Sequence, residues 1–467
     1  PNHSKASYVR SAALQRIVAP GANIAYDVLV HIGLARFLEC RQCEEISIEL
    51  SRHFGLEVPP STVSYLAHKF IAYFQAVHQE SVDLLRRDMR SRGGYILHVD
   101  GTCEEGSRVL LVCLDSLSGQ VLESRKIASE NNDDVRKVLK DLRRFWCIPL
   151  AIVHDLRKAL IPAGGDVFPG TPQFLCHYHL APDVGKDILS SDVDKLRRLF
   201  RRSKVRAKLG ALVRSLKDYA VSPDGLDHAI VPVLQLRSKR KLHQYCTPEM
   251  AKGAAHALAS WILAFRRTGE GYGFPFDLPY LVLYQRILDV HQVLSCADKA
   301  WPKGSRGPVG SLNRLRAILD PVATGEYADE FREIISQTER NVKVFNSFRA
   351  ALRVCPKGGN QRRNDSGAPV TLTRKRHEAS LRKLRASLRR RIRSGGPSAN
   401  AAKIVVDHLD KYWKYLFGHV LRPRSRKTIT VPRTNNVQER LFRLVKRQCR
   451  RLHGRGHLSH DIDAMLP

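Results

Sequence analysis

The sequence has few acidic residues for the number of its basic ones. It contains 45 Asp and Glu against 78 Lys and Arg, which gives a formal net charge of +33 over 467 residues and an isoelectric point near 10.1. A compact protein with this excess of one charge repels itself unless a polyanion neutralises it. The charge therefore predicts a polyanionic partner, of which nucleic acid is the most common kind.

Long apolar runs and repeated cysteine motifs are also missing. No run approaches the roughly 18 apolar residues of a membrane-spanning helix, and no signal peptide is recognisable. We therefore expect no membrane association.

Apart from Cys40 and Cys43, the ten cysteines are scattered singly, unlike the dense spacing of a secreted disulfide scaffold. This pattern predicts a reducing compartment, the cytoplasm.

The chain is long enough for several domains. With 43% hydrophobic residues it is globular, and its length exceeds what one core usually organises. The sequence begins with Pro1, so it leaves open whether residues precede it. Composition and periodicity predict a helical N-terminal region at 1–91, an α/β region at 92–189, a mostly helical, basic region at 190–430, and a basic helix within 431–467.

Residues 44–75 have the pattern of a helix-turn-helix. Its first helix is indicated by apolar residues four apart, Ile46, Leu50 and Phe54, and Gly55 can adopt the left-handed conformation that ends a helix. Pro60-Ser61-Thr62 then offers an N-cap to a second helix. Such a helix can enter a major groove, although an ordinary helical hairpin has the same pattern. The side chains that would face DNA are Ser61, Thr62, Ser64, Tyr65, His68 and Lys69.

Residues 95–180 have the pattern of strands and helices that is typical of an α/β domain. Apolar, β-branched runs predict strands at 96–100, 109–115, 121–127 and 150–154, and residues 134–146 predict a helix before the last of them. The order βββαβ is typical of the start of a ribonuclease H-like fold, in which the first and fourth strands lie side by side. We therefore expect these two strands to be neighbours.

Three carboxylates stand where a metal-dependent nuclease would need them. Asp100 and Asp155 follow the first and the fourth predicted strand, and Glu439 lies near the start of a predicted helix. Neighbouring strands would bring the two aspartates together. Carboxylates gathered in this way can hold a pair of Mg²⁺ ions, which can activate a water or a 3′-hydroxyl against a phosphodiester.

Each of these acidic residues, taken alone, also has an ordinary structural explanation. Asp100-Gly101 can form a turn, Asp155 can cap a helix, and Glu439 follows Asn436 at the spacing of a capping box. These explanations account neither for the buried strands before the aspartates nor for the basic residues that follow Glu439. Those residues are Arg440, Arg443, Lys446, Arg447, Arg450 and Arg451.

Together these segments resemble bacterial DDE transposases of the Mutator-like and related insertion-sequence groups, over about residues 92–185 and 430–456. The resemblance implies a ribonuclease H-like catalytic domain interrupted by an all-α insertion and preceded by a helical DNA-binding region. It implies a catalytic, metal-binding triad of Asp100, Asp155 and Glu439, with two Mg²⁺ ions per active site and Mn²⁺ as a substitute. The matching segments are Asp100-Gly101-Thr102, His154-Asp155, Phe168-Pro169, Cys176-His177-Tyr178-His179 and Thr434-Asn435-Asn436 with Glu439.

The Cys176-x-x-His179 motif also raises the question of a zinc site. These residues are too few for a closed tetrahedral site, and no partner pair lies nearby in sequence. We therefore expect Cys176 and His179 to shape the active site by packing and hydrogen bonding, as Asn435 and Asn436 do at the start of the catalytic helix. Cys40 and Cys43 lack a second cysteine pair, and we expect no zinc there.

The insertion contains a helix with a narrow apolar stripe of Leu381, Leu384, Leu388 and Ile392. Its other faces are basic with little acidic compensation, which favours contact with phosphates over a merely solvated face. Trp301 is a candidate for stacking on a flipped base, whereas Trp261 and Trp413 are expected in cores. The DNA-contacting residues expected from this helix and the catalytic helix are Arg382, Lys383, Arg389, Arg390, Arg443, Lys446, Arg447 and Arg450.

The resemblance implies a DNA transposase that binds the ends of a mobile element and catalyses metal-dependent cleavage and strand transfer on double-stranded DNA. Two ends must be processed together, so we expect a homodimer or larger synaptic complex, associated with the bacterial nucleoid. Two alternatives remain open. A domesticated transposase acting as a sequence-specific DNA-binding regulator would share the charge, and a ribonuclease H-like nuclease without joining activity would share the triad.

Overall fold

The structure of the protein is a computed structural model that describes most of the chain. Its described residues form two compact units, one from Pro1–Cys176 and Tyr415–Pro467 and the other from His177–Asn364 and Ala368–Lys414. The last part of the chain therefore folds together with the first. The described residues are 11–104, 107–155, 159–220, 248–269, 271–298, 310–352, 374–417, 420–421, 429–454 and 459.

The first unit contains a five-stranded mixed sheet. The strands are β1 (Ile96–Thr102), β2 (Val109–Asp115), β3 (Gln120–Ile127), β4 (Ala151–His154) and β5 (Gln173–Leu175). Their order is β3-β2-β1-β4-β5, with antiparallel pairing among β1, β2 and β3 and parallel pairing of β1 with β4 and of β4 with β5. The prediction that the first and fourth strands are neighbours is confirmed, whereas β5 was not predicted.

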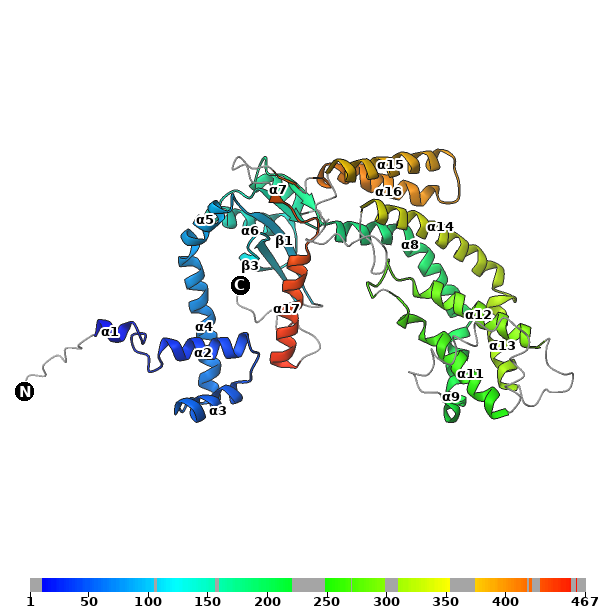
Figure 1. Cartoon of the computed structure of the whole chain (residues 1–467), viewed down its shortest axis with the longest axis horizontal. Helices are drawn as coiled ribbons and strands as arrows, with labels where there is room; N and C mark the ends of the chain where they lie inside the picture. Colours follow the sequence, from blue (N-terminus) through cyan, green and yellow to red (C-terminus); the bar gives the residue numbers. More distant parts are fainter. Residues whose placement is uncertain are drawn as a thin grey trace, which may run out of the picture. The chain divides into compact units, whose positions relative to one another are not determined.

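Different helices cover the two faces of this sheet. Leu97 and Val99 of β1 share a core with α6 (Asn132–Phe145) and α7 (Leu160–Val167). Side chains alternate along a strand, so the residues between them face the other way. On that second face Leu110 and Val112 of β2 pack against Phe442 of α17 (Asn436–His453). Figure 1 shows α17 running beside the strands of the sheet.

Replacing Phe442 by Ala should loosen α17 from the sheet. Phe442 is buried against Leu110 and Val112, so its loss leaves a cavity and is expected to lower the free energy of unfolding by about 3–5 kcal/mol. Urea unfolding of the first unit measures this change. Leu444→Ala on the same helix is the control, because Leu444 is exposed and its loss should cost less than about 0.5 kcal/mol. Equal losses in the two variants would contradict this account of the docking.

The N-terminal helices of the first unit have a core of their own. They are α1 (Ala12–Gln15), α2 (Tyr26–Phe37), α3 (Cys43–Phe54), α4 (Pro60–Glu80) and α5 (Val82–Ser91), and α2, α3 and α4 pack together. Gly55 ends α3 in the left-handed conformation, as predicted. The predicted N-cap of α4 is wrong. The helix begins at Pro60, with Pro59 as its N-cap and no side-chain cap, because proline fits the first helical position without needing an N–H.

The described residues of the second unit are helical, as the sequence pattern predicts. None of the described helices in either unit combines the length and the apolar character that crossing a membrane requires. The helices are α8 (His177–Arg202), α9 (Val205–Ser215), η1 (Lys217–Tyr219), α11 (Pro248–Leu263), η3 (Ala264–Arg267), α12 (Pro279–Asp298), α13 (Gly310–Ala323), α14 (Ala328–Leu352), α15 (Arg374–Arg393) and α16 (Ala399–Tyr412). The described part of the chain also contains the short elements η4 (Trp413–Tyr415), β6 (Val420–Leu421) and β7 (Ile429–Thr430), of which β6 and β7 belong to the first unit.

The tryptophans singled out from the sequence have different surroundings. Trp261 is partly buried and packs against the large core shared by α8, α9 and α11 to α14. Trp413 is only half-buried, and the guanidinium of Arg385 lies over its ring, 4.2 Å from the centroid. The prediction that Trp413 lies in a core is therefore only partly confirmed. Trp301 lies outside the described residues.

The basic helix α15 has more acidic partners than predicted. Arg382 pairs with Glu378 at 2.6 Å, and Arg385 and Arg389 both pair with Asp410 of α16, at 3.0 and 2.7 Å. The prediction that the basic residues of α15 have few acidic partners is therefore wrong. It could not include Asp410, which belongs to another helix. A groove of about 630 Å³ is nevertheless lined almost entirely by arginines of α15. Within the described part of the chain, Lys383, Arg390, Arg391 and Arg393 make no ion pair.

Candidate metal centre

Asp100 and Asp155 come from neighbouring strands. In the parallel pairing of β1 with β4, Val99 lies opposite His154, so Asp100 and Asp155 are the next residues along the two chains. Ile96 of β1 and Val153 of β4 share a core with Val431 on the face opposite α6, and alternation directs Asp100 and Asp155 to that face. Both residues are buried, at 3% and 5% exposure. The register thus places the two aspartates at neighbouring positions on the same face of the sheet.

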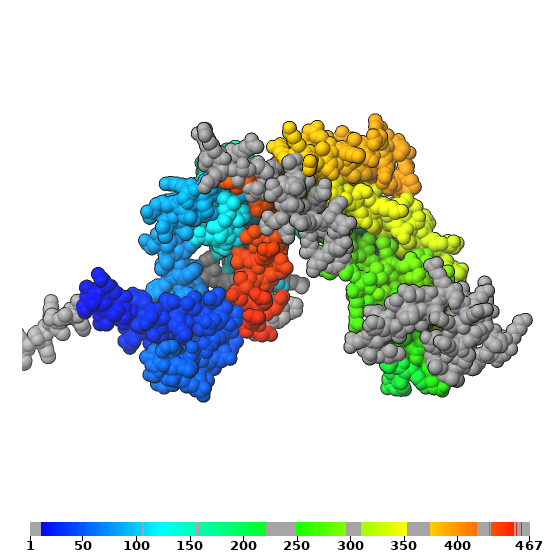
Figure 2. All heavy atoms as spheres, in the orientation of Figure 1, coloured from blue at the N-terminus to red at the C-terminus, as the bar shows by residue number. Residues whose placement is uncertain are grey.

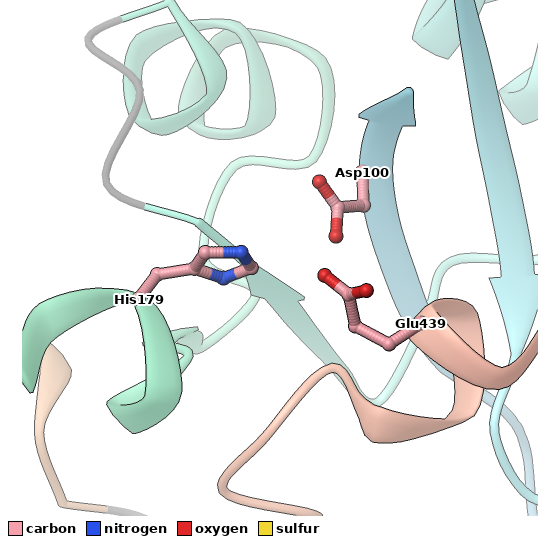
Figure 3. A group of neighbouring side chains, drawn as sticks. All are labelled: Asp100, His179 and Glu439. Atoms are coloured by element: carbon pink, nitrogen blue, oxygen red, sulfur yellow. The ribbon is translucent and has the colours of Figure 1, made fainter. Parts of the chain in front are cut away.

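Asp100 belongs to a group of three side chains that can hold a metal ion. One ligand atom each from Asp100, His179 and Glu439 lies within 4.8 Å of the others, and Figure 3 shows the three side chains pointing toward one another. Asp100 is supplied by β1, Glu439 by the first turn of α17, and His179 by the first turn of α8, shortly after β5. His179 was expected to act through packing and hydrogen bonding, and its ring lies among the candidate ligands.

Asp155 is not part of this group. The main chain at Asp155 is fixed by the buried ring of His154, whose Nδ1 lies 2.8 Å from the carbonyl oxygen of Asp155. The Nε2 of the same ring lies 3.0 Å from the side-chain oxygen Oε1 of Gln173 on β5. Burial lowers the pKa of His154. A carbonyl oxygen can only accept, so the ring donates to that of Asp155 from Nδ1. These contacts hold the chain in place where it leaves β4.

The ordinary explanations for the three carboxylates do not fit the structure. Asp100 and Gly101 lie within β1 and not in a turn. The helix after Asp155 is α7, and its N-cap is Ala159. The N-cap of α17 is Asn435 and has no side-chain cap bond, so Glu439 is one residue too far along the helix for a capping box. None of the three residues is therefore needed for the local turn or cap that would explain it.

Asn435 connects the start of α17 to the sheet. Its side-chain nitrogen Nδ2 donates to Oδ2 of Asp100 at 3.3 Å, and its main-chain N–H donates to Sγ of Cys176 at 3.1 Å. Its side-chain oxygen lies 2.9 Å from Nδ1 of His98. Asn435 thus links Cys176, His98 and Asp100 at the start of α17. Asn436 is the first residue of α17 and is half-buried.

His98 and Gln438 are two residues of this network that the sequence reasoning missed. Gln438 Nε2 donates to the carbonyl oxygens of His98, at 3.2 Å, and of Val112, at 2.7 Å. His98 is completely buried, and burial lowers its pKa to about 4, so the ring is neutral at neutral pH. One signal was available in the sequence. His98 stands two residues before Asp100 and therefore on the same face of β1.

The donor atoms of the group suit a divalent cation. Carboxylate oxygens bind Mg²⁺ and Mn²⁺, and an imidazole nitrogen suits transition metals, so the ligand types admit several metals without selecting one. Asp100 is already oriented, because Gly101 N–H donates to its Oδ1 at 2.9 Å and Asn435 donates to its Oδ2. Among the residues that the structure describes, Cys40 and Cys43 are not part of any such group.

Basic side chains occupy exposed positions of α17. The helix forms part of the surface in Figure 2, where it is orange-red. Arg443, Arg447 and Arg450 are exposed. Lys446 instead pairs with Glu104 at 2.9 Å, next to the end of β1. It therefore has a structural role beside any contact with DNA.

The residues of α4 that were predicted to face DNA are only partly exposed. Ser61, Tyr65 and His68 are exposed, whereas Thr62, Ser64 and Lys69 are half-buried. Tyr65 has 64% of its surface exposed, so its ring is accessible on α4. The last turn of α17 is joined to this helical region by a hydrogen bond of 3.1 Å from Gln42 Nε2 to the carbonyl oxygen of Leu452.

Comparison with known proteins assigns no family to this chain. No protein-family model matches the sequence, and no curated protein matches it. The function is therefore inferred from the geometry of the site, the charge and the sequence motifs.

Proposed function

We propose that the protein is a DNA transposase, which cleaves the ends of a mobile DNA element and joins them to target DNA at one metal-dependent site. The observation that carries this proposal is the grouping of Asp100, His179 and Glu439, together with the β1–β4 register that sets Asp155 at the position next to Asp100. The neighbouring first and fourth strands agree with a ribonuclease H-like domain. The net charge of +33 supports nucleic acid as the substrate.

In this proposal Asp100, Asp155 and Glu439 hold divalent cations, with His179 as a further ligand. Bound cations of this kind lower the pKa of an attacking water or 3′-hydroxyl and stabilise charge on the leaving oxygen. The protein contributes fixed ligands, since the amide of Gly101 and the side chain of Asn435 each hold one oxygen of Asp100. Hydrolysis at an element end leaves a 3′-hydroxyl, which then attacks target DNA in the same site. No covalent bond between protein and DNA is needed.

Two surfaces of the first unit would bind the DNA. The exposed arginines of α17 follow Glu439 on the same helix, so they can hold phosphates next to the cleaved bond. The helices α3 and α4 would act as a helix-turn-helix, with Ser61 and Tyr65 of α4 toward a major groove. In the second unit, the arginine-lined groove of α15 offers a further phosphate-binding surface.

The products formed from labelled DNA separate this proposal from its alternatives. Duplexes taken from the DNA that flanks the gene are incubated with the protein, a plasmid target and Mg²⁺ or Mn²⁺. We expect nicks with a free 3′-hydroxyl and labelled strands joined to the plasmid. Binding without nicks would favour the DNA-binding regulator, and nicks without joined products would favour a simple nuclease.

Mn²⁺ is expected to support cleavage better than Mg²⁺. The reason is that His179 adds an imidazole nitrogen to the candidate ligands, and nitrogen ligands suit Mn²⁺ better than Mg²⁺. His179→Asp would replace this nitrogen by a carboxylate oxygen. The ratio of the cleavage rate in Mn²⁺ to that in Mg²⁺ should then fall by roughly tenfold. An unchanged ratio would show that His179 is not a ligand.

A further inference from the structure

A buried chain of hydrogen bonds leads from His98 to Asp100. His98 Nδ1 lies 2.9 Å from Oδ1 of Asn435, and Nδ2 of Asn435 lies 3.3 Å from Oδ2 of Asp100. His98 and Asn435 have no more than 1% of their surface exposed, so water cannot take the place of either partner. All three residues belong to the first unit.

Only one direction of donation satisfies this chain. As a metal ligand, Asp100 would be an ionised carboxylate, which accepts hydrogen bonds and cannot donate, so Asn435 turns its NH₂ group toward it. The side-chain oxygen of Asn435 then faces His98 and accepts a hydrogen bond. His98 must therefore carry its proton on Nδ1. The histidine N–H thereby stabilises the orientation in which the amide of Asn435 donates to Asp100.

The main chain around Asn435 is held independently of this amide. The N–H of Asn435 donates to Cys176 Sγ, and Gln438 one turn later donates to the carbonyl oxygens of His98 and Val112. The start of α17 is therefore fixed on the sheet by contacts that do not need the ring of His98. What the ring adds is the orientation of one side-chain amide.

We propose that His98 is a positioning residue for the metal centre, which acts through Asn435 to hold the carboxylate of Asp100 in the orientation that binds a cation. This inference rests on the proposed function, in which Asp100 is a metal ligand. Without the N–H of His98, the buried oxygen of Asn435 loses its donor, which costs free energy as long as the amide keeps its NH₂ group toward Asp100. A rotation of the amide that relieves this cost weakens the hydrogen bond to Asp100 and leaves the carboxylate free to turn.

Two substitutions of similar size separate positioning from packing. His98→Asn keeps an N–H donor near the place of Nδ1, and His98→Leu removes it. Burial favours the apolar side chain, so His98→Leu should have a thermal midpoint equal to or above that of His98→Asn. The affinity for Mn²⁺, measured on the full-length protein without DNA by electron paramagnetic resonance, should have the opposite order. We expect binding that is 10- to 100-fold weaker in His98→Leu and largely retained in His98→Asn.

A double substitution tests whether His98 acts through Asn435. Asn435→Ala should itself weaken Mn²⁺ binding, because it removes the donor to Asp100. Adding His98→Leu to Asn435→Ala should then change the affinity by less than about twofold, since the intermediary is already gone. Independent, additive losses would overturn the proposed route.

The outcomes distinguish this inference from the proposed function. Wild-type protein that binds Mn²⁺ while His98→Leu binds it equally well would overturn the role of His98 and leave the transposase proposal standing. Weaker Mn²⁺ binding in His98→Leu, with binding retained in His98→Asn, would support the role of His98. This holds even if the wild type never cut DNA, a result that would overturn the transposase proposal alone. Wild-type protein that binds Mn²⁺ no better than Asp100→Asn would overturn both.

Discussion

Asp100→Asn is expected to lower metal-dependent DNA cleavage by on the order of 10³-fold or more. The substitution keeps the size of the side chain and removes its negative charge, so the metal loses a ligand that both the sheet and α17 hold in place. In this variant the side-chain amide of Asn435 would also face the new side-chain amide at position 100 instead of a carboxylate. Single-turnover cleavage of a labelled duplex measures the change, and a DNA-binding assay on the same samples should show an affinity within about twofold of the wild type.

The matched control is Asp133→Asn. Asp133 is exposed on α6, which covers the face of the sheet opposite α17. The same chemical change at this position should leave the cleavage rate unaltered. Near wild-type cleavage by Asp100→Asn would contradict the assignment of the catalytic site to the α17 face of the sheet.

The second large effect is expected from the exposed arginines of α17. Replacing Arg443, Arg447 and Arg450 together by Gln removes three charges that would neutralise phosphates. Each phosphate contact contributes about 0.9 to the slope of log Kd against log salt concentration, so the slope should fall by about 3. The affinity for duplex DNA at roughly 0.1 M salt should fall by on the order of 10²-fold or more. Binding titrations at several salt concentrations provide both quantities.

A charge-matched control lies on the other side of the sheet. Lys137, Lys140 and Arg144 are exposed on α6, and their replacement by Gln removes the same charge from the same unit. We expect the salt slope to change by less than about 1 in this variant. Equal changes in the two triple variants would mean that the charge acts through the protein as a whole and that α17 is not a specific contact surface.

Local patterns predicted the strands that carry the aspartates. The apolar runs before Asp100 and Asp155 gave β1 and β4 to within two residues at each end, because a buried strand is recognisable from its own sequence. The order of the elements then predicted that these strands are neighbours. The turn at Gly55 was predictable for the same reason, since a left-handed residue at a helix end depends on the local chain.

Contacts between distant segments were not predictable in this way. The links from His98 to Asn435 and from Asn435 to Cys176 join residues that only the folded sheet brings together. Asp410, which compensates two arginines of α15, belongs to another helix and could not be assigned to them from the sequence. The role of His179 depends likewise on where β5 ends, and the three residues of that strand are too few to show a pattern.

The most direct test of the central claim is cleavage and joining of labelled element ends in Mg²⁺ or Mn²⁺ by the wild type beside Asp155→Ala and Glu439→Ala. The proposed function requires both carboxylates, one from the end of β4 and one from α17. We expect the wild type to cut and join, and both variants to bind the ends but do neither. A wild type that binds the ends and never cuts with either metal, or variants that cut as well as the wild type, would contradict the account.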